Sequence, residues 1–517
     1  MNHLMIAPVL LPAVLGALQL LWMRGDLPLQ RVFSSTGTAL LVVVALILLG
    51  QASAGEVMVY RLGNWAAPFG IVLMLDRLAA MMVLLTSVVA LIVQIYAIGS
   101  GWDRKGWHFH ALWQFQLMGV CGAFLTGDAF NLFVFFEILL IASYGLMTHG
   151  GGEMRVRAGV QYVVVNLAGS ALFLVALGVL YAVTGTLNMA DMAARVAQMP
   201  PEDTALLRTG AVLIMLVFAI KAALVPLHFW LPSTYGNAPG PVAALFAIMT
   251  KVGVYAIIRF FTLIFPHDTV AGTLASEILL PAALITLAVG QIGIMGSRQL
   301  LRVGAFAALG SVGTLMIAVS QMNAEAMTAA IYYMVHSTLA AATLFLVLDL
   351  SARWRGDYWL RAGTVMPQSG LVSALFFAAA VAVVGLPPFS GFIGKLMVLD
   401  ATAGAPAMPL IWSVILVTSL IALVGMSRVG TKLYLKPFGE VVLGGGGGSA
   451  DFPTAPLRSD EPAPWLSVTA IMALLATVLA LTVFAGPATR FAQATADQLY
   501  DPALYLKAVL ADQEGTK

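Results

Sequence analysis

Long apolar runs alternate with short polar segments along the whole chain. A run of about 20 apolar residues is long enough to cross the ~30 Å hydrocarbon core of a membrane as an α-helix. The pattern predicts fourteen such helices. The first of them is expected to be retained and not cleaved as a signal peptide, because no basic segment precedes its apolar run. The predicted spans are residues 3–23, 31–50, 71–99, 107–126, 127–148, 155–184, 205–235, 239–263, 273–297, 300–320, 324–350, 370–402, 407–433 and 464–487.

Composition supports an all-α polytopic membrane protein. Of 517 residues, 60% are hydrophobic and only 10% are charged, and the mean hydropathy is +0.94. A net charge of +2 gives no electrostatic reason to expect a nucleic-acid partner. The single Cys121 excludes an internal disulfide and a cysteine-based metal cluster. His108 and His110 are two residues apart, so on one helix they face different ways, and we expect no metal or cofactor site.

The basic residues predict the orientation of the spans. Of 26 Lys and Arg, with residues at the span margins counted in the adjoining loops, 15 fall in the odd-numbered loops, 6 in the even-numbered loops and both tails, and 5 within spans. By the positive-inside rule, the odd-numbered loops are cytoplasmic and both termini are extracytoplasmic. The basic residues within spans are Arg77, Lys221, Lys251, Arg259 and Lys395.

Two segments differ from the helical pattern. Residues 55–70 alternate enough to suggest either a short extracytoplasmic hairpin or an ordered loop. Residues 436–463 are rich in Gly and Pro and predict a flexible cytoplasmic linker. These segments divide the chain into five parts. They are three helices with the hairpin or loop (1–105), a first set of five helices (106–264), a second set (265–435), the linker (436–463), and a last helix with a short tail (464–517).

Five ionisable residues fall deep within predicted spans: Glu137, Lys221, Lys251, His336 and Lys395. Glu137, for example, has about ten mostly apolar residues on each side, hence ~15 Å to either helix end. Each charge at bilayer depth costs ~2.5–3.5 kcal/mol on insertion scales. Such a cost indicates that these side chains either pair with one another or serve a function.

The residue types favour proton transfer over fixed charge. Lys is the minority base, with 8 Lys against 18 Arg, yet three of the eight Lys lie deep in spans. Lysine can lose its proton when it is removed from water, whereas arginine effectively cannot. Static pairing is the alternative, but Glu137 is the only carboxylate in a lysine-rich set. His228, near the end of its span, is a secondary candidate.

Prolines interrupt two of the predicted helices. Pro226 leaves the carbonyl of Ala222 without its helical donor, and Pro387 and Pro388 do the same for Val383 and Val384. In hydrocarbon such carbonyls must find other donors inside a bundle or a water-filled cavity. Lys221 precedes its break and Lys395 follows its break, which suits two repeats of inverted topology. Ordinary proline kinks are the alternative.

The motifs around these residues resemble a known family. They are "LWQFQLMGVCGAFLTGDAFNLFVFFEILLIASYG", "KAALVPLHFWLPSTYGNAPGPVAALFAIMTKVGVYAIIR" and "VVGLPPFSGFIGKL". They are similar to the antiporter-like subunits of respiratory complex I, membrane-bound hydrogenases and multisubunit Mrp-type cation/proton antiporters, over nearly the whole chain. Within that superfamily they resemble most the D subunits of Mrp-type Na+/H+ antiporters. Lys395 agrees with this, because one complex I relative is expected to have glutamate there.

The resemblance implies fourteen helices, inverted five-helix repeats and a membrane-embedded file of charged residues with water between them. It implies a Glu137–Lys221 pair, followed by Lys251, His336 and Lys395. It also implies partners, namely a larger A-type antiporter-like subunit and small membrane subunits of an Mrp complex in a bacterial inner membrane, with lipid around them.

Three functions remain open at this point. The leading hypothesis is a proton-translocating subunit of a secondary antiporter, which exchanges H+ for Na+ or K+ and is not an enzyme. The second is a proton-pumping membrane subunit of a complex I or hydrogenase assembly. The third is a scaffold that holds an ion-conducting partner.

Overall fold

The computed structural model describes residues 3–200, 204–267, 269–361, 368–436 and 464–510, and it is almost entirely helical. The predicted all-α membrane fold is confirmed, because 12 helices in the described residues are long and apolar enough to cross a membrane. The helices are α1 (Ala7–Leu21), α2 (Leu27–Ala52), α3 (Arg77–Ser100), α4 (Phe109–Leu125), α5 (Ala129–Thr148), α6 (Glu153–Thr184), α7 (Met189–Ala197), α8 (Ala205–Ala222), α9 (Trp230–Asn237), α10 (Gly240–Phe246), α11 (Met249–Leu263), α12 (Val270–Gly296), α13 (Leu300–Val319), α14 (Ala324–Arg355), α15 (Ser369–Val384), α16 (Ser390–Ala401), α17 (Met408–Gly430), α19 (Trp465–Val483), α20 (Ala485–Tyr500) and α21 (Ala503–Leu510).

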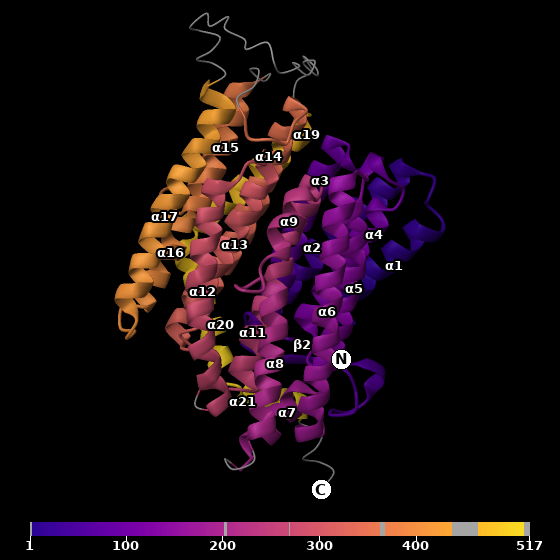
Figure 1. Cartoon of the computed structure of the whole chain (residues 1–517). Helices are drawn as coiled ribbons and strands as arrows, with labels where there is room; N and C mark the ends of the chain where they lie inside the picture. Colours follow the sequence, from indigo (N-terminus) through magenta and orange to yellow (C-terminus); the bar gives the residue numbers. More distant parts are fainter. Residues whose placement is uncertain (1–2, 201–203, 268, 362–367, 437–463, 511–517) are drawn as a thin grey trace, which may run out of the picture.

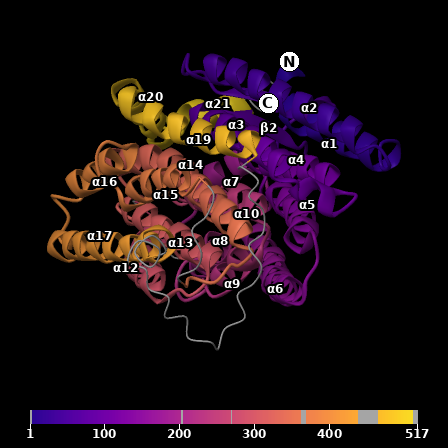
Figure 2. The same cartoon turned by 90° about the horizontal axis from the view of Figure 1, so that it is seen from above.

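The helices pack side by side in one elongated bundle (Figure 1). Seen from above, α1 and α2 lie at one edge, α16 and α17 lie at the other, and α14 runs through the interior (Figure 2). Of the 32 residues of α14, 26 are buried, so this helix lies in the core of the bundle. The count of fourteen spans stays a prediction, because α4, α15 and α16 have only 17, 16 and 12 residues and are each short for a membrane-crossing helix. The inverted relation of the two five-helix sets also stays a prediction.

A β-hairpin forms where the sequence left a hairpin or a loop open. Strand β1 (Met58–Arg61) pairs antiparallel with β2 (Val72–Leu75), and Met58 lies opposite Leu75. The second strand therefore occupies the start of the span predicted at 71–99, and α3 begins later, at Arg77. Hydropathy alone placed the span too early, because a buried apolar strand gives the same signal as a helix.

The chain after α19 forms two further helices that the sequence analysis expected as a short tail. In α20 the buried residues recur at helical spacing: Ala492, Thr495, Ala496 and Leu499. This narrow apolar stripe is typical of a helix that lies against a bundle, and a search for long apolar runs misses it. Gln498 anchors α20 by accepting from the backbone N–H of Arg77 and donating to the carbonyl of Gly55. The predicted linker at 436–463 lies almost entirely outside the described residues.

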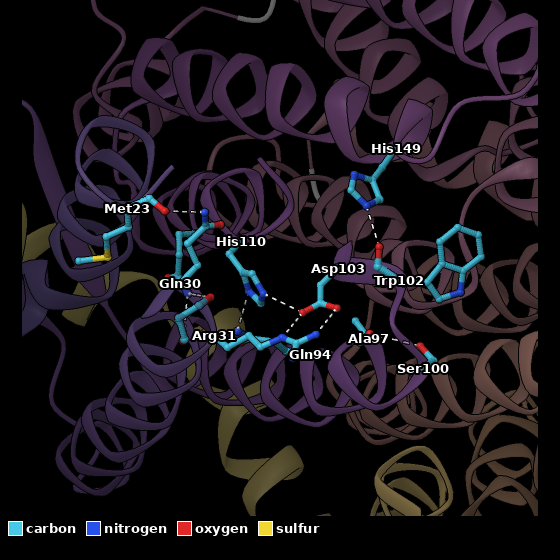
Figure 3. A network of polar contacts seen from close by, with 12 residues as sticks. Met23, Gln30, Arg31, Gln94, Ala97, Ser100, Trp102, Asp103, His110 and His149 are labelled. Atoms are coloured by element: carbon cyan, nitrogen blue, oxygen red, sulfur yellow. Dashed lines mark hydrogen bonds and ion pairs between the residues drawn. The ribbon is translucent and has the colours of Figure 1, made fainter. Parts of the chain in front are cut away.

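A polar network joins the N-terminal helices at the end that carries the basic loops (Figure 3). Arg31 of α2 donates two hydrogen bonds to Asp103, at 2.6 and 2.9 Å, and His110 Nε2 lies 3.3 Å from the same carboxylate. Asp103 is in the 3-10 turn Trp102–Lys105 between α3 and α4. Burial acts to raise the pKa of Asp103, but the hydrogen bonds from His110 and Arg31 outweigh it and lower that pKa. The network therefore ties α2, α4 and this turn together around a carboxylate that stays charged.

A buried ion pair fixes the opposite end of α3. Arg259 of α11 lies 2.6 Å from Asp76, with both side chains at most 5% exposed. Asp76 also caps α3, because its Oδ1 accepts from the backbone N–H of Ala79 at 2.8 Å. Arg259 Cζ also lies over the ring of Tyr505 in α21, 5.5 Å from the ring centre. One ion pair thus joins α3, α11 and the C-terminal helix α21.

Asp76→Asn tests this junction. Asparagine keeps an oxygen for the Ala79 N–H but leaves the buried Arg259 without its counter-charge, a change that costs ~3–5 kcal/mol in comparable cases. We expect a clear drop in the melting temperature of the detergent-purified protein. Asp26→Asn is the matched control, since Asp26 caps α2 through the N–H of Leu29 in an exposed position. Equal melting temperatures for the two variants would contradict the role given to the ion pair.

Candidate functional site

The first interrupted helix breaks where the sequence predicts. Helix α8 ends at Ala222, the chain turns through Pro226, and α9 begins at Trp230. The Trp230 indole N–H donates to the carbonyl of Ile220 at 3.0 Å. The backbone N–H of Val225 donates to Thr286 Oγ1 of α12 at 2.9 Å. Side chains thus satisfy backbone groups of the break, one of them from the second set of helices.

A lysine from α16 hydrogen-bonds to the backbone at the second break. Helix α15 ends at Val384 and α16 begins at Ser390, with Pro387 and Pro388 between them. The Lys395 ammonium donates to the carbonyl of Val384 at 2.6 Å and to Ser419 Oγ of α17 at 2.9 Å. Val384 is one of the carbonyls that the prolines were expected to leave without a donor. The lysine therefore supplies the hydrogen bond that Pro388 removes.

Glu137 of α5 and Lys221 of α8 are linked through a serine. Ser170 of α6 donates a short hydrogen bond to Glu137 Oε1. The Lys221 ammonium lies 3.4 Å from the oxygen of the same serine. No direct Glu137–Lys221 ion pair within 4.0 Å occurs among the described residues, so the expected pair is bridged by a hydroxyl.

Asn166 and Phe136 complete the surroundings of Lys221. The ammonium lies 3.3 Å from Asn166 Oδ1 and 5.8 Å from the centre of the Phe136 ring. Sequence analysis missed Asn166 and Ser170. Their spacing of four residues, which places them on one face of an apolar helix, is the signal that indicates them.

Lys251 is buried without a partner. It lies near the start of α11, is 0% exposed, and its Nζ has no hydrogen-bond partner in the described part of the chain. Gly253, two residues later, packs so closely against α8 that a Cβ there would lie 2.6 Å from the backbone nitrogen of Ala222. The close approach places the helix of Lys251 directly beside the end of the helix of Lys221.

His336 faces the second break. Its Nδ1 lies 2.9 Å from Ser390 Oγ, at the first residue of α16. A Cβ at Gly391 would lie 2.7 Å from His336 Nε2 and would clash with the carbonyl oxygen of Ala382. The imidazole is therefore held between the two halves of the interrupted helix.

The predicted residues form two clusters. Glu137 and Lys221 form the first around Ser170, and His336 and Lys395 form the second around the α15–α16 break. In the ranges that the structure describes, no side-chain hydrogen bond or ion pair joins the clusters or reaches the Lys251 ammonium. The secondary candidate His228 lies in the α8–α9 turn, and its buried Nδ1 has no partner there either. No three His, Cys, Asp or Glu among the described residues could hold a metal ion.

Comparisons with known proteins agree on one family. A family profile described as "NADH:quinone oxidoreductase/Mrp antiporter, TM" matches residues 126–422. The D subunit of a probable K(+)/H(+) antiporter from Rhizobium meliloti is 37% identical, covering 99% of this chain and 98% of the relative. The D subunit of a Na(+)/H(+) antiporter from Alkalihalophilus pseudofirmus is 36% identical, covering 99% and 100%. A chain in the Mrp complex from Dietzia sp. DQ12-45-1b is 28% identical with a TM-score of 0.86, covering 99% and 100%.

Gly391→Ala tests the close contact at the second break. The added methyl group meets the Ala382 carbonyl, which is backbone and cannot rotate away, and overpacking of this kind costs ~1–3 kcal/mol. We expect a lower melting temperature than that of Gly404→Ala, whose new Cβ meets nothing within 4 Å. If Gly391→Ala is as stable as the control, α16 does not pack on His336 as described.

Proposed function

The chain belongs to the family of NADH:quinone oxidoreductase and Mrp antiporter membrane subunits, and we propose that it is the proton-translocating D subunit of a multisubunit Na+/H+ antiporter. One observation supports the proposal most strongly. Each interrupted helix has a buried lysine at its break, and the lysine is held by hydroxyls and amide oxygens instead of by a carboxylate. Such partners accept hydrogen bonds from an ammonium without adding the negative charge that would fix the proton there.

The hydroxyl bridge provides a route between Glu137 and Lys221. Ser170 donates to the carboxylate and lies within reach of the ammonium. A proton can pass from the lysine nitrogen to the serine oxygen while the serine proton passes to the carboxylate. This exchange converts an ammonium and a carboxylate into an amine and a carboxylic acid, with the serine unchanged. Lys221 is thereby the switch of the first cluster.

The remaining steps need water. Lys251 has no direct partner in the described residues, and neighbouring helix axes lie ~8–10 Å apart, beyond hydrogen-bond reach. Ordered waters can carry protons over such gaps. We infer a route from Lys221 to Lys251 and on to His336 and Lys395. At the end of this route, the Lys395 ammonium releases the proton at the α15–α16 break.

The exchanged cation is expected to bind elsewhere in the complex. A dehydrated Na+ takes several oxygen ligands, but Glu137 is the one carboxylate of the proposed file. The relatives carry both Na(+)/H(+) and K(+)/H(+) in their names, so similarity to these relatives does not restrict the exchange to one cation. We propose that this subunit moves protons inward while partner Mrp subunits, including an A-type antiporter-like subunit, handle the cation.

The proposed setting is the inner membrane of a bacterium, with the basic loops in the cytoplasm and both termini outside. In this role the chain is a transporter subunit and not an enzyme. A redox-driven pump subunit, the alternative from the same superfamily, is distinguished by what copurifies. Iron–sulfur or nickel proteins would identify that alternative, and small membrane subunits alone would identify the Mrp complex.

Lys221→Ala and Lys221→Arg test the proposed switch. Arginine keeps a fixed positive charge but does not release its proton, so both variants should lower the antiport rate in everted vesicles by on the order of 100-fold. The assembled complex should still be present by native electrophoresis. Lys507→Arg, an exposed change on α21, is the matched control and should leave the rate unchanged. A Lys221→Arg variant that transports normally would show that Lys221 is a static ion, as the scaffold hypothesis requires.

A further inference from the structure

A buried carboxylate that the proposed route does not use lies on α14. Asp349 is 0% exposed. Its Oδ2 accepts hydrogen bonds from the Tyr96 hydroxyl at 2.8 Å and from the Trp102 indole N–H at 2.9 Å. Its Oδ1 is buried too, and has no hydrogen-bond partner in the described residues. A buried polar atom without a partner is costly and rare, so Oδ1 marks a position for a water molecule or a proton.

Asp349 faces the helix segment that carries Lys251. Gly240, the first residue of α10, packs against it so closely that a Cβ there would lie 2.5 Å from Asp349 Oδ1. Lys251 follows Gly240 by eleven residues, which corresponds to about three helical turns and ~16 Å along the α10–α11 segment. Three turns bring a helix back toward the same side, and in α10 and α11, which are separated only by residues 247 and 248, Lys251 follows the contact with Asp349 by that interval. Lys251 of α11 and Asp349 of α14, each with a buried polar atom that has no partner in the described residues, thus belong to neighbouring elements joined by the Gly240 contact.

α14 offers a polar step on the same side. Thr338 precedes Asp349 by eleven residues, again about three turns, and it is completely buried. Its hydroxyl donates to the carbonyl of Met334 at 2.8 Å. A hydroxyl that has donated its proton can still accept from water. Thr338 therefore places a hydrogen-bond acceptor on the side of α14 that carries Asp349, about three turns from it.

The indole ring that donates to Asp349 has three cations around it. Three cations gather at the Trp102 ring, with Lys105 Nζ, Arg155 Cζ and Arg353 Cζ at 3.9, 5.2 and 5.8 Å from its centre. The backbone of Trp102 is held by His149, whose Nε2 lies 2.8 Å from the Trp102 carbonyl oxygen (Figure 3).

Lys105, one of these three cations, is in contact with solvent. It is exposed and lines a surface cavity of about 360 Å³. Burial lowers the pKa of Lys105, Arg353 and Arg155 lower it further, and Asp349 acts against them. The pKa of Lys105 is therefore lower than that of an ordinary surface lysine.

We propose that Asp349 is a further proton-transfer residue, which connects Lys251 with the end of the bundle that carries the basic loops. The inference rests on the proposed function. A proton leaves the Lys251 ammonium, crosses by water and forms the O–H bond of a neutral Asp349 side chain. That bond then breaks toward solvent beside Lys105, and the cations at Trp102 favour this release because they stabilise the carboxylate that remains. The file thus has a branch at Lys251, in addition to the route through His336 to Lys395.

A purely structural anchor is the competing role, since Asp349 joins α14 to α3 through Tyr96. Four variants of the complete complex separate the two roles. Asp349→Asn keeps an oxygen acceptor for Tyr96 and Trp102 but cannot carry a proton, and Asp349→Glu restores the carboxyl group. Tyr96→Phe removes one anchoring hydrogen bond and leaves the carboxylate. Glu325→Gln is the matched control, being the same kind of change at an exposed position on the same helix.

We expect Asp349→Asn to lower Na+-driven proton movement in everted vesicles about tenfold or more. Asp349→Glu should recover a substantial part of the rate, and Tyr96→Phe and Glu325→Gln should remain close to wild type. Wild-type transport by Asp349→Asn would overturn the inference. So would equal losses in Asp349→Asn and Tyr96→Phe, or failure of both Asp349 variants to assemble, because each outcome indicates an anchor. A parallel Lys221→Ala assay keeps the two proposals apart, since transport by that variant would contradict the proposed function itself.

Discussion

The structure depends on one constraint, which is that a broken helix and a buried ammonium are each costly in hydrocarbon and each less so together. At the α15–α16 break the buried ammonium directly replaces the missing backbone donor. Pro388 removes the donor for the Val384 carbonyl, and the Lys395 ammonium replaces it at 2.6 Å. The same carbonyl dipole stabilises a charged lysine without neutralising it, which a carboxylate would do. A site of this kind can gain and lose a proton while the backbone around it stays in place.

Close packing around the breaks holds these groups in position. Gly253 brings α11 against the end of α8, and Gly391 brings α16 against His336 and the Ala382 carbonyl. Helix α14, most of which is buried, carries His336 at the α15–α16 break and Asp349 at its contact with Tyr96 of α3. Two ionic networks fix the two ends of α3, through Asp103 at the basic end and through Asp76 at the other. The proposed proton sites therefore lie on closely packed helices, and in the proposed route water carries the proton from one site to the next.

Much of this architecture could be predicted from the sequence, and the exceptions share a physical cause. Long apolar runs identified most spans, and the prolines identified the breaks and the Val384 carbonyl that needs a donor. The β2 strand and the α20 helix were misassigned, because a hydropathy window does not distinguish a buried strand from a helix start or detect a narrow apolar stripe. Ser170 and Asp349 were missed for a different reason. The four-residue spacing of Asn166 and Ser170 marks one face of α6 but does not tell what that face contacts, and nothing local distinguishes Asp349 near the end of its span. Their importance comes from side chains that the fold brings from other helices. The linker and the inverted repeat remain predictions from sequence.

The central claim is that this chain moves protons while the cation binds elsewhere in the complex. The most direct measurement is proton movement across everted vesicles driven in turn by Na+, K+ and Li+, with the wild-type complex and with Lys395→Ala. The account predicts that the substitution lowers proton movement by the same factor for each cation that the wild-type complex exchanges, because the lysine handles only the proton. A change in the order of preference among the three cations, or an undiminished rate, would contradict it.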